Sequence, residues 1–528
     1  MSKPWIAGRS DVLAREAMVA SSQPLATQAG VNTLRNGGNA VDAAVAAAAV
    51  LDVVEPFSTG CGGDAFALLH FPDHKTPIGF NGSGRAGSLV GLHHLISRGW
   101  TEMPTRGGAP VTVPGAMHLW YTLVKNYGRL EFKDVLASAI RYAHEGFPVS
   151  PKIATVWKDA TFYLRGKEAL GLFTIDGTGP EMGQIMHNRD LAKTFETVAT
   201  EGIESFYGGE IGEAIAETVQ SHGGFVSTDD MKKHETKETT PLESSYRGAR
   251  VYEHPPNSQG FAAQLMLNIM ETFDMSKFSS LDADRYHFMI EAKKLAYADL
   301  ELHNADPDFY RVPVDKLLSK DYAAKRAGLV TLKGAMDVPN AGISKSSDTV
   351  YLATADADGM AVSFINSLYM SFGSGLVVPG WGIKLQNRGA LFSLDQSHPN
   401  CYWPGKLPFH TLCPGAMYDD EGLLGVFGIM GGDHQAEAHA QFVSNIVDCH
   451  MSPQQAVDHP RFHHDQHSNT VSLEPGMALV ARKDLEKRGH NIVQNSTSQF
   501  GGGQAIFRSN GVWIAGSDRR KDGQASGY

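Results

Sequence analysis

One stretch, NAVDAAVAAAAVLD at residues 39–52, constrains the fold most, because apolar residues, mainly alanine, lie on nearly every side of it. Asn39 can serve as its N-cap, and Asp42 falls in the first turn, where an acidic side chain favours a helix. A helix without a polar face has to be buried, and its small side chains let neighbouring elements approach closely. The stretch predicts a buried inner helix in a layered protein of helices and sheets.

The rest of the chain mixes the two kinds of secondary structure. Apolar periodicity predicts helices over 130–144 and 285–302, and strands over 66–71, 350–355 and 361–365. With 528 residues, 42% of them hydrophobic, the chain can bury a large core without disulfides, metals or a partner. No linker-like stretch or internal repeat interrupts it, which indicates one compact unit.

Residues 349–367, TVYLATADADGMAVSFINS, consist of two β-prone runs around an acidic and glycine-containing turn, and predict a hairpin. If Asp356 and Gly359 flank the turn, Thr349 lies opposite Asn366. A single-residue bulge would bring Ser367 directly opposite Thr349. The hairpin therefore predicts that two hydroxyl groups converge at its open end.

A second local pattern, GVFGIMGGDHQAEAHAQFVSNIVDC, predicts an apolar strand, a turn at Gly431 and Gly432, and an amphipathic helix with Asp433 as its N-cap. Backbone N–H groups at such a turn point outward, and the helix dipole favours negative charge there, so the turn can hold an oxyanion. A purely structural glycine turn is the more common interpretation of this pattern.

The charge distribution and the cysteine spacing argue against several kinds of binding partner. The net charge is −11, with acidic and basic residues interspersed, which does not favour nucleic acid or an anionic membrane. The four cysteines are scattered and form no zinc-ligand spacing. The N-terminal residues carry charges where a signal peptide needs an apolar core, and the apolar run 43–51 falls short of the roughly 20 residues that span a bilayer. We therefore expect a cytoplasmic protein with no membrane segment.

Two motif matches lack the sequence context that a binding site needs. Residues 82–87, GSGRAG, match G-x-G-x-x-G, but no clear second strand follows to close a dinucleotide-binding unit. The histidines at 463, 464 and 467 have no clear carboxylate partner, so a solvated loop is the favoured interpretation and no metal or cofactor is predicted.

The ordered blocks VASSQPLATQAG, LRNGGNAVDAAVA, GCGGDAF, VTVPGAM, GRLEFKDVLASAIRYAHEGFPVS, SSDTVYLATADADGMAVSF and GIMGGDHQ resemble the γ-glutamyltransferase family of N-terminal nucleophile hydrolases over nearly the whole chain. The resemblance implies an α+β fold, a four-layer αββα sandwich. It also implies a proenzyme that cleaves itself between Asp348 and Thr349 into a large subunit, 1–348, and a small subunit, 349–528. These would form one intertwined heterodimer, or a dimer of such heterodimers.

The same resemblance implies the catalytic roles. Thr349 corresponds to the nucleophile, whose newly freed α-amine serves as the base, and Ser367 to a second hydroxyl that orients it. Gly431 and Gly432 correspond to the glycines of the oxyanion hole. An α-amine has an ordinary pKa near 8, so a useful fraction is unprotonated near neutrality. From local pattern alone, Thr349 would be an ordinary strand residue.

The substrate-binding positions depart from the family pattern. Glutamyl-specific members grip the substrate α-carboxylate and α-amino group at positions that here hold a different set of residues: Ser83, Tyr369, Arg388, Leu391, His410 and Thr411. With the family's aspartate replaced, an α-ammonium group has no anionic partner. Arg388 can bind a carboxylate bidentately, with Arg85 as a possible contributor, although a structural ion pair of Arg388 is an equal alternative.

These departures resemble the subgroup that contains oxamate amidohydrolase and glutaryl-cephalosporin acylases. The expected activity is hydrolysis of a small carboxylate-bearing amide such as oxamate, to oxalate and ammonia, through an acyl-enzyme. A glutaryl-cephalosporin-type acylase and a true γ-glutamyltransferase are the nearest alternatives. A catalytically inactive, metabolite-binding scaffold is the alternative of another class.

Overall fold

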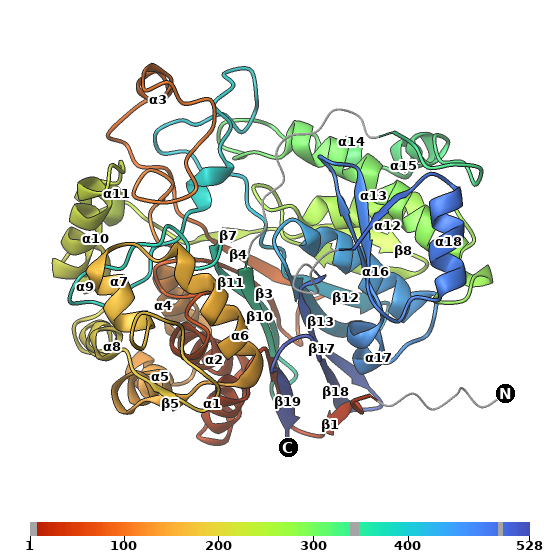
Figure 1. Ribbon diagram of the computed structural model, residues 1–528. Helices are drawn as coiled ribbons and strands as arrows, with labels where there is room; N and C mark the ends of the chain where they lie inside the picture. The colour runs from red at the N-terminus through yellow and green to blue at the C-terminus, as the bar shows by residue number, and fades with distance from the viewer. Residues whose placement is uncertain (1–7, 338–347, 495–499) are drawn as a thin grey trace.

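Two seven-stranded antiparallel sheets pack face to face, and helices cover the outer face of each (Figure 1). The structure is a computed structural model and describes residues 8–337, 348–494 and 500–528. Between the sheets lies an apolar layer that includes Met18, Phe66 and Tyr351. The arrangement confirms the predicted four-layer αββα sandwich.

Both sheets are built from strands on either side of residue 348, so the two halves of the chain are intertwined. The β13 sheet has the order β1 (Val12–Ala14), β18 (Val512–Ser517), β17 (Gly502–Ser509), β13 (Gly422–Met430), β12 (Gly415–Asp419), β9 (Ala249–Glu253) and β8 (Leu242–Tyr246). The β10 sheet has the order β19 (Gln524–Gly527), β2 (Met18–Ser21), β10 (Asp348–Ala355), β11 (Ala361–Tyr369), β3 (Asp64–His70), β4 (Ile78–Gly82) and β7 (Lys237–Thr239).

The outer layer on the β10 sheet contains the alanine-rich helix, α2 (Ala40–Val54), and every residue of this helix is buried. Asn39 caps it through a capping box with Asp42, as its sequence predicts. Around α2 lie α1 (Pro24–Arg35), α4 (Ala116–Tyr127), α5 (Phe132–Glu145), α6 (Pro151–Ala160), α7 (Gly166–Phe173), α8 (Arg189–Glu201), α9 (Glu204–Tyr207), α10 (Glu210–Ser221) and α11 (Thr228–Lys232).

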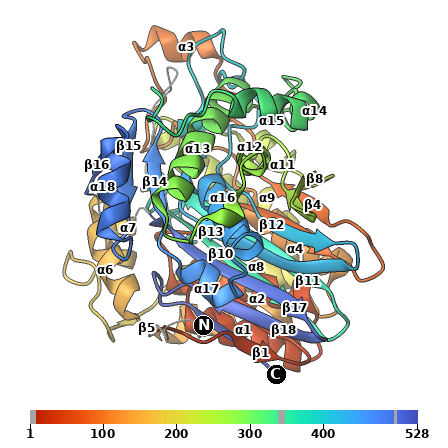
Figure 2. The same cartoon turned by 90° about the vertical axis from the view of Figure 1, so that its right-hand side faces the viewer.

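The outer layer on the β13 sheet is a second group of helices, which faces the viewer in Figure 2. It consists of α12 (Gly260–Glu271), α13 (Ala283–His303), α14 (Val314–Leu317), α15 (Lys320–Ala327), α16 (His434–Val447), α17 (Pro453–Asp458) and α18 (Leu479–Lys487). Outside the layers lie α3 (Leu92–Ser97), the pair β5 (Phe147–Pro148) and β6 (Ile185–Met186), and the small sheet β14 (Phe462–Asp465), β15 (Thr470–Leu473) and β16 (Asn491–Val493). Short 3-10 turns are η1 (Thr161–Tyr163), η2 (Met275–Lys277) and η3 (Arg388–Leu391). Among the described helices, none is long and apolar enough to cross a bilayer.

The predicted hairpin is present as β10 and β11, but its register differs by one residue from the prediction. Val350, not Thr349, lies opposite Asn366. The connection is one residue longer than expected, because Asp356 pairs with Met360 and its carboxylate accepts hydrogen bonds from two N–H groups of the turn. Gly359 closes the turn at φ 91°, in the left-handed region that favours glycine.

The segment with three histidines is not the solvated loop that its sequence suggested. His463 and His464 lie on β14, and His464 is buried. Only His467, beyond the end of the strand, is exposed. The local sequence gave no sign of this, because β14 is buried by contact with α13 and α16, which are distant in the chain.

Candidate active site

Two hydroxyl groups meet at the open end of the β10–β11 hairpin. Thr349 Oγ1 lies 3.1 Å from Ser367 Oγ, and both side chains are buried. The backbone N–H of Tyr369 donates to Ser367 Oγ at 2.7 Å, which fixes the position of the serine hydroxyl. The strands shift register between Asp348 and Val350, so the irregularity falls at Thr349. The geometry brings together the two hydroxyl groups whose roles the family resemblance predicts.

The glycine turn follows β13, as predicted. Gly431 and Gly432 have φ values of 137° and 60°, in the region that glycine adopts without strain. Gln259 Nε2 donates both to the carbonyl of Gly432, at 2.8 Å, and to that of Thr411, at 2.6 Å. The buried amide therefore ties the predicted oxyanion turn to the segment that carries Thr411 and its neighbour His410.

Arg388 lies in η3 and is completely buried. Its Nη1 donates to Thr411 Oγ1 at 2.8 Å, and its guanidinium lies over the ring of Tyr369, 4.5 Å from the centroid. Within the described part of the chain, Nε and Nη2 have no hydrogen-bond partner. Burial lowers the pKa of Arg388 to about 10, although Asp64 opposes the shift. The structure thus brings three predicted substrate-binding residues together around a cation with two unused donor atoms.

Asp64, at the start of β3, is a site residue that the motif reading did not single out. Its carboxylate accepts from the Gly84 N–H at 3.0 Å and from His410 Nε2 at 3.1 Å. Burial raises the pKa of Asp64 to about 7 and lowers that of His410 well below its usual range, so the imidazole is neutral at pH 7. An acidic residue inside the apolar, glycine-rich block GCGGDAF was the available signal.

Ser83 and Arg85 are occupied by other contacts. Ser83 Oγ donates to Asn81 Oδ1 at 2.7 Å. The guanidinium of Arg85 forms ion pairs with Asp306, at 3.1 Å, and Asp308, at 2.7 Å. The contribution of Arg85 to substrate binding stays a prediction, and its guanidinium already pairs with two carboxylates, one of them shared with Lys237. Ser83 and Arg85 line a small cavity of about 170 Å³.

A larger cavity, of about 740 Å³, adjoins the glycine turn and is lined in part by Gln259, Leu391 and Asp433. Asp433 occupies the N-cap position of α16, but its side chain does not cap the helix. Its backbone is helical, with φ −64° and ψ −21°, rather than extended as in most capping residues. Burial raises the pKa of Tyr369 and lowers that of Arg388; the Asp433 charge adds to the first shift and opposes the second.

The profile of the gamma-glutamyltranspeptidase family matches residues 26–528, nearly the entire chain. The chain belongs to this family. It is 36% identical over 525 residues to the glutathione hydrolase-like YwrD proenzyme of Bacillus subtilis, covering 98% of this chain and 99% of the relative. It is 33% identical over 525 residues to the oxamate amidohydrolase proenzyme of Klebsiella pneumoniae, covering 97% and 98%.

The fold agrees with this membership of the gamma-glutamyltranspeptidase family. A crystal structure of a cephalosporin acylase from Bacillus halodurans superposes with a TM-score of 0.93 at 40% identity, covering 100% of this chain and 98% of that one. The chain is therefore an enzyme of the N-terminal nucleophile hydrolase class, and the hydroxyl pair, the glycine turn and Arg388 form its candidate active site.

Proposed function

We propose that this chain is a self-processing amidohydrolase with Thr349 as its nucleophile, and that its substrate is a small amide bearing a carboxylate, such as oxamate. The new α-amine of Thr349 accepts the hydroxyl proton, and the hydroxyl oxygen attacks the amide carbonyl. The N–H groups of Gly431 and Gly432 stabilise the oxyanion. Ammonia or an amine leaves, and water hydrolyses the acyl-enzyme.

The single observation that carries the substrate assignment is the environment of Arg388. A buried cation without a partner is costly, because desolvation is not repaid. Arg388 is completely buried, and within the described residues its guanidinium bonds only to the neutral hydroxyl of Thr411. Its Nε and Nη2 are adjacent donors on one edge of the guanidinium, the geometry that suits a bidentate carboxylate. A substrate carboxylate at this edge would accept from both unused donors.

The cavity next to the glycine turn favours a second candidate for the leaving group. Ammonia, the product expected from oxamate, needs little space, whereas a volume of about 740 Å³ is within the range of drug-sized ligand sites. A cephalosporin-acylase-like reaction, with Arg388 on the acyl carboxylate and a bulky amine in the cavity, uses both features. The sequence similarity to the oxamate amidohydrolase proenzyme of Klebsiella pneumoniae supports the smaller substrate.

Self-processing is tested by denaturing electrophoresis. Division of 57.1 kDa in the proportion of 348 to 180 residues gives bands of about 38 and 19.5 kDa. An intact wild-type chain would contradict the proposal, because the α-amine base would never form. It would support the inactive scaffold instead.

The substrate class is tested with a panel of oxamate, glutaryl-p-nitroanilide and γ-glutamyl-p-nitroanilide. Turnover of oxamate is followed by ammonia release and that of the anilides by absorbance. We expect turnover of at least one of the first two and little of the third, because Leu391 replaces the aspartate with which glutamyl-specific members bind the α-ammonium group. Turnover of the γ-glutamyl substrate alone would identify a true γ-glutamyltransferase.

A further inference from the structure

The first turn of α16, directly after the glycine turn, contains the hydroxyl group of a tyrosine from another helix. In several other helices the carbonyl of the N-cap residue accepts directly from the N–H four residues further on, as Gln23 does from Thr27 in α1. In α16 the hydroxyl of Tyr297, on α13, bridges these two groups. It donates to the carbonyl of Asp433, the N-cap residue, and accepts from the N–H of Glu437 at 3.2 Å.

The ring of Tyr297 is held in place, and its hydroxyl keeps its proton near neutral pH. The side chain is buried, and the ammonium group of Lys293 lies over the ring, 3.9 Å from its centroid. A cation at this distance from an aromatic face is attracted to it. Burial and the charges of Glu437 and Asp433 raise the pKa of Tyr297 well above its ordinary value. The hydroxyl is therefore available as a donor.

Trans peptide groups connect this hydroxyl to the glycine turn. In a trans peptide the C=O and N–H groups point in opposite directions. The Asp433 carbonyl, which accepts from Tyr297, lies opposite the N–H of His434, and this N–H donates to the carbonyl of Gly431 at 3.1 Å. The Gly431 carbonyl in turn lies opposite the N–H of Gly432, the predicted oxyanion donor. Tyr297 thus begins a series of hydrogen bonds that ends at this N–H.

The N–H group at the end of the series points away from α16, because the Gly431 carbonyl points towards the helix. Within the described part of the chain, the N–H groups of Gly431 and Gly432 donate to no protein group. Hydrogen bonds in series polarise one another, so each bond makes the next donor stronger. Loss of the first bond should therefore weaken the Gly432 N–H as a donor and make its direction less fixed.

A second side chain holds the neighbouring carbonyl of the same turn. Gln259, at the start of α12, donates to the carbonyl of Gly432 at 2.8 Å, while Tyr297 donates to that of Asp433. Two consecutive carbonyls are therefore fixed by side chains from outside α16. Donors that are fixed before the reaction begins stabilise a developing charge most effectively, because they need no reorganisation.

We propose that Tyr297 is a positioning residue, whose hydroxyl directs and polarises the Gly432 N–H towards the oxyanion of the tetrahedral intermediate. The inference rests on the proposed function, in which the glycine turn stabilises that oxyanion. Tyr297 also lines the cavity of about 740 Å³, where its ring could contact a leaving group. Removal of the hydroxyl alone separates the two roles, since the ring remains.

Tyr297→Phe is the test variant. Without the hydroxyl, the Asp433 carbonyl and the Glu437 N–H belong to one helical turn and can bond to each other, so we expect the variant to fold. Tyr286→Phe is the matched control, because Tyr286 is buried on the same helix and donates its hydroxyl to the carbonyl of Pro460 at 2.8 Å. Each variant loses one bond from a tyrosine to a carbonyl, so both should lower the unfolding temperature by similar, small amounts.

The kinetic constants are measured with any amide of the panel that the wild type turns over, and kcat is expressed per cleaved chain, as determined by electrophoresis. We expect Tyr297→Phe to reduce kcat about 10-fold and to leave KM nearly unchanged. Removal of a complete oxyanion donor costs about 100-fold or more in kcat, and here one donor is weakened rather than removed. Tyr286→Phe should keep the wild-type kcat.

Equal kcat values of Tyr297→Phe and Tyr286→Phe would overturn the inference. A change in KM alone would also overturn it, since Tyr297 would then act only as a wall of the cavity. An unfolding temperature of Tyr297→Phe far below that of Tyr286→Phe would assign the hydroxyl a structural role instead. If the wild type turns over no amide, the proposed function itself fails, and this inference fails with it.

Discussion

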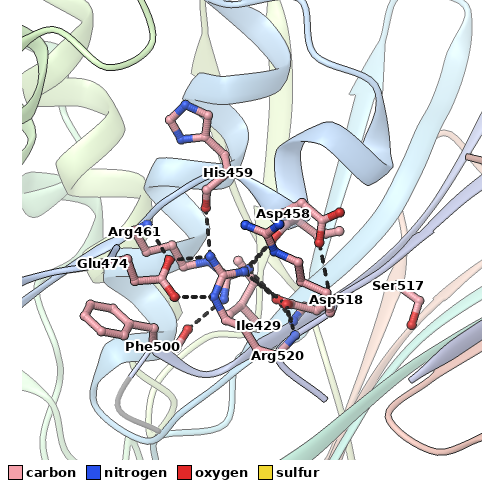
Figure 3. Close-up of polar contacts among 12 residues, drawn as sticks. Ile429, Asp458, His459, Arg461, Glu474, Phe500, Ser517, Asp518 and Arg520 are labelled. Carbon is pink, nitrogen blue, oxygen red and sulfur yellow. Dashed lines mark hydrogen bonds and ion pairs between the residues drawn. The ribbon is translucent and has the colours of Figure 1, made fainter. Parts of the chain in front are cut away.

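Two buried arginines of this enzyme, Arg461 and Arg388, have opposite surroundings. Arg461 donates to the carbonyls of Phe500 and Val457 and pairs with Asp518 at 2.7 Å, in a network with Arg520 (Figure 3). The two arginine charges lower the pKa of Asp518 to about 2. Arg388, in contrast, has a neutral hydroxyl as its hydrogen-bond partner and forms no ion pair within the described residues.

This difference indicates that Arg461 stabilises the fold, whereas Arg388 can bind a ligand. The charge of Arg461 is satisfied within the chain, so the arginine holds α17, β14 and the segment after β18 together. Arg388 keeps two donor atoms for a ligand and lies over the ring of Tyr369, whose N–H holds the Ser367 hydroxyl beside Thr349. Substitutions near Arg388 should therefore change activity and spare stability, and substitutions near Arg461 should do the reverse.

The largest effect is expected at the nucleophile. Thr349→Ala should leave a single uncleaved band and reduce kcat/KM by about 10⁴-fold or more, because both the hydroxyl and the α-amine base are lost. Electrophoresis and substrate turnover measure the two losses. Thr349→Ser, which keeps a hydroxyl, is the matched control and should still be cleaved. Processing of Thr349→Ala at the same bond would rule out Thr349 as the nucleophile.

Arg461→Met should have the largest effect on stability. Removal of one partner from a buried ion pair leaves Asp518 without its closest cation, and the free energy of unfolding should fall by about 3–5 kcal/mol. Denaturant unfolding measures the loss. If the variant unfolds at the wild-type denaturant concentration, the network is not structural and the comparison fails.

Arg388→Met is the same substitution at the other arginine. For a carboxylate-bearing substrate, kcat/KM should fall about 100-fold, equivalent to about 3 kcal/mol, because a buried charge-assisted contact is lost. The free energy of unfolding should not fall, since an unpaired buried cation is removed. A loss of stability as large as that of Arg461→Met would make Arg388 a structural residue.

The smallest expected effect is on the free energy of unfolding at acidic pH. The folded-state pKa of Asp518, about 2, lies below its ordinary value of 3.8, so the carboxylate stabilises the fold above pH 3.8. This contribution, about 2 kcal/mol, is lost as the pH falls from about 4 to 2. Unfolding at pH 5 and pH 3 should show about half of this loss in the wild type but none of it in Asp518→Asn, with the exposed Asp73→Asn as control. An unchanged pH dependence in Asp518→Asn would show that other groups cause it.

The sequence predicted the features that depend on neighbouring residues. Asn39 and Asp42 cap α2 through contacts within four residues, and the turn between β10 and β11 is closed by hydrogen bonds from the N–H groups of Asp358 and Met360 to the Asp356 carboxylate. Even there, the register was off by one, because the hydrogen bonds of the Asp356 carboxylate that lengthen the turn are not visible in a pairing pattern.

Features that depend on distant contacts were not predictable in the same way. Asp64 is hydrogen-bonded to His410, 346 residues away, and Arg85 forms an ion pair with Asp306, 221 residues away. His463 is placed on a strand only because α13 and α16 pack against β14. The family resemblance identified the candidate site residues, but the partners of each charge required the folded chain.

The most direct measurement is the ratio of kcat/KM between a carboxylate-bearing amide and its neutral counterpart, in the wild type and in Arg388→Met. Suitable pairs are oxamate with oxamide, and glutaryl-p-nitroanilide with its terminal amide. We expect the wild type to prefer the carboxylate about 100-fold and the variant to show a ratio near one. Equal turnover of both members of each pair by the wild type would contradict the assignment of Arg388 as the carboxylate-binding residue.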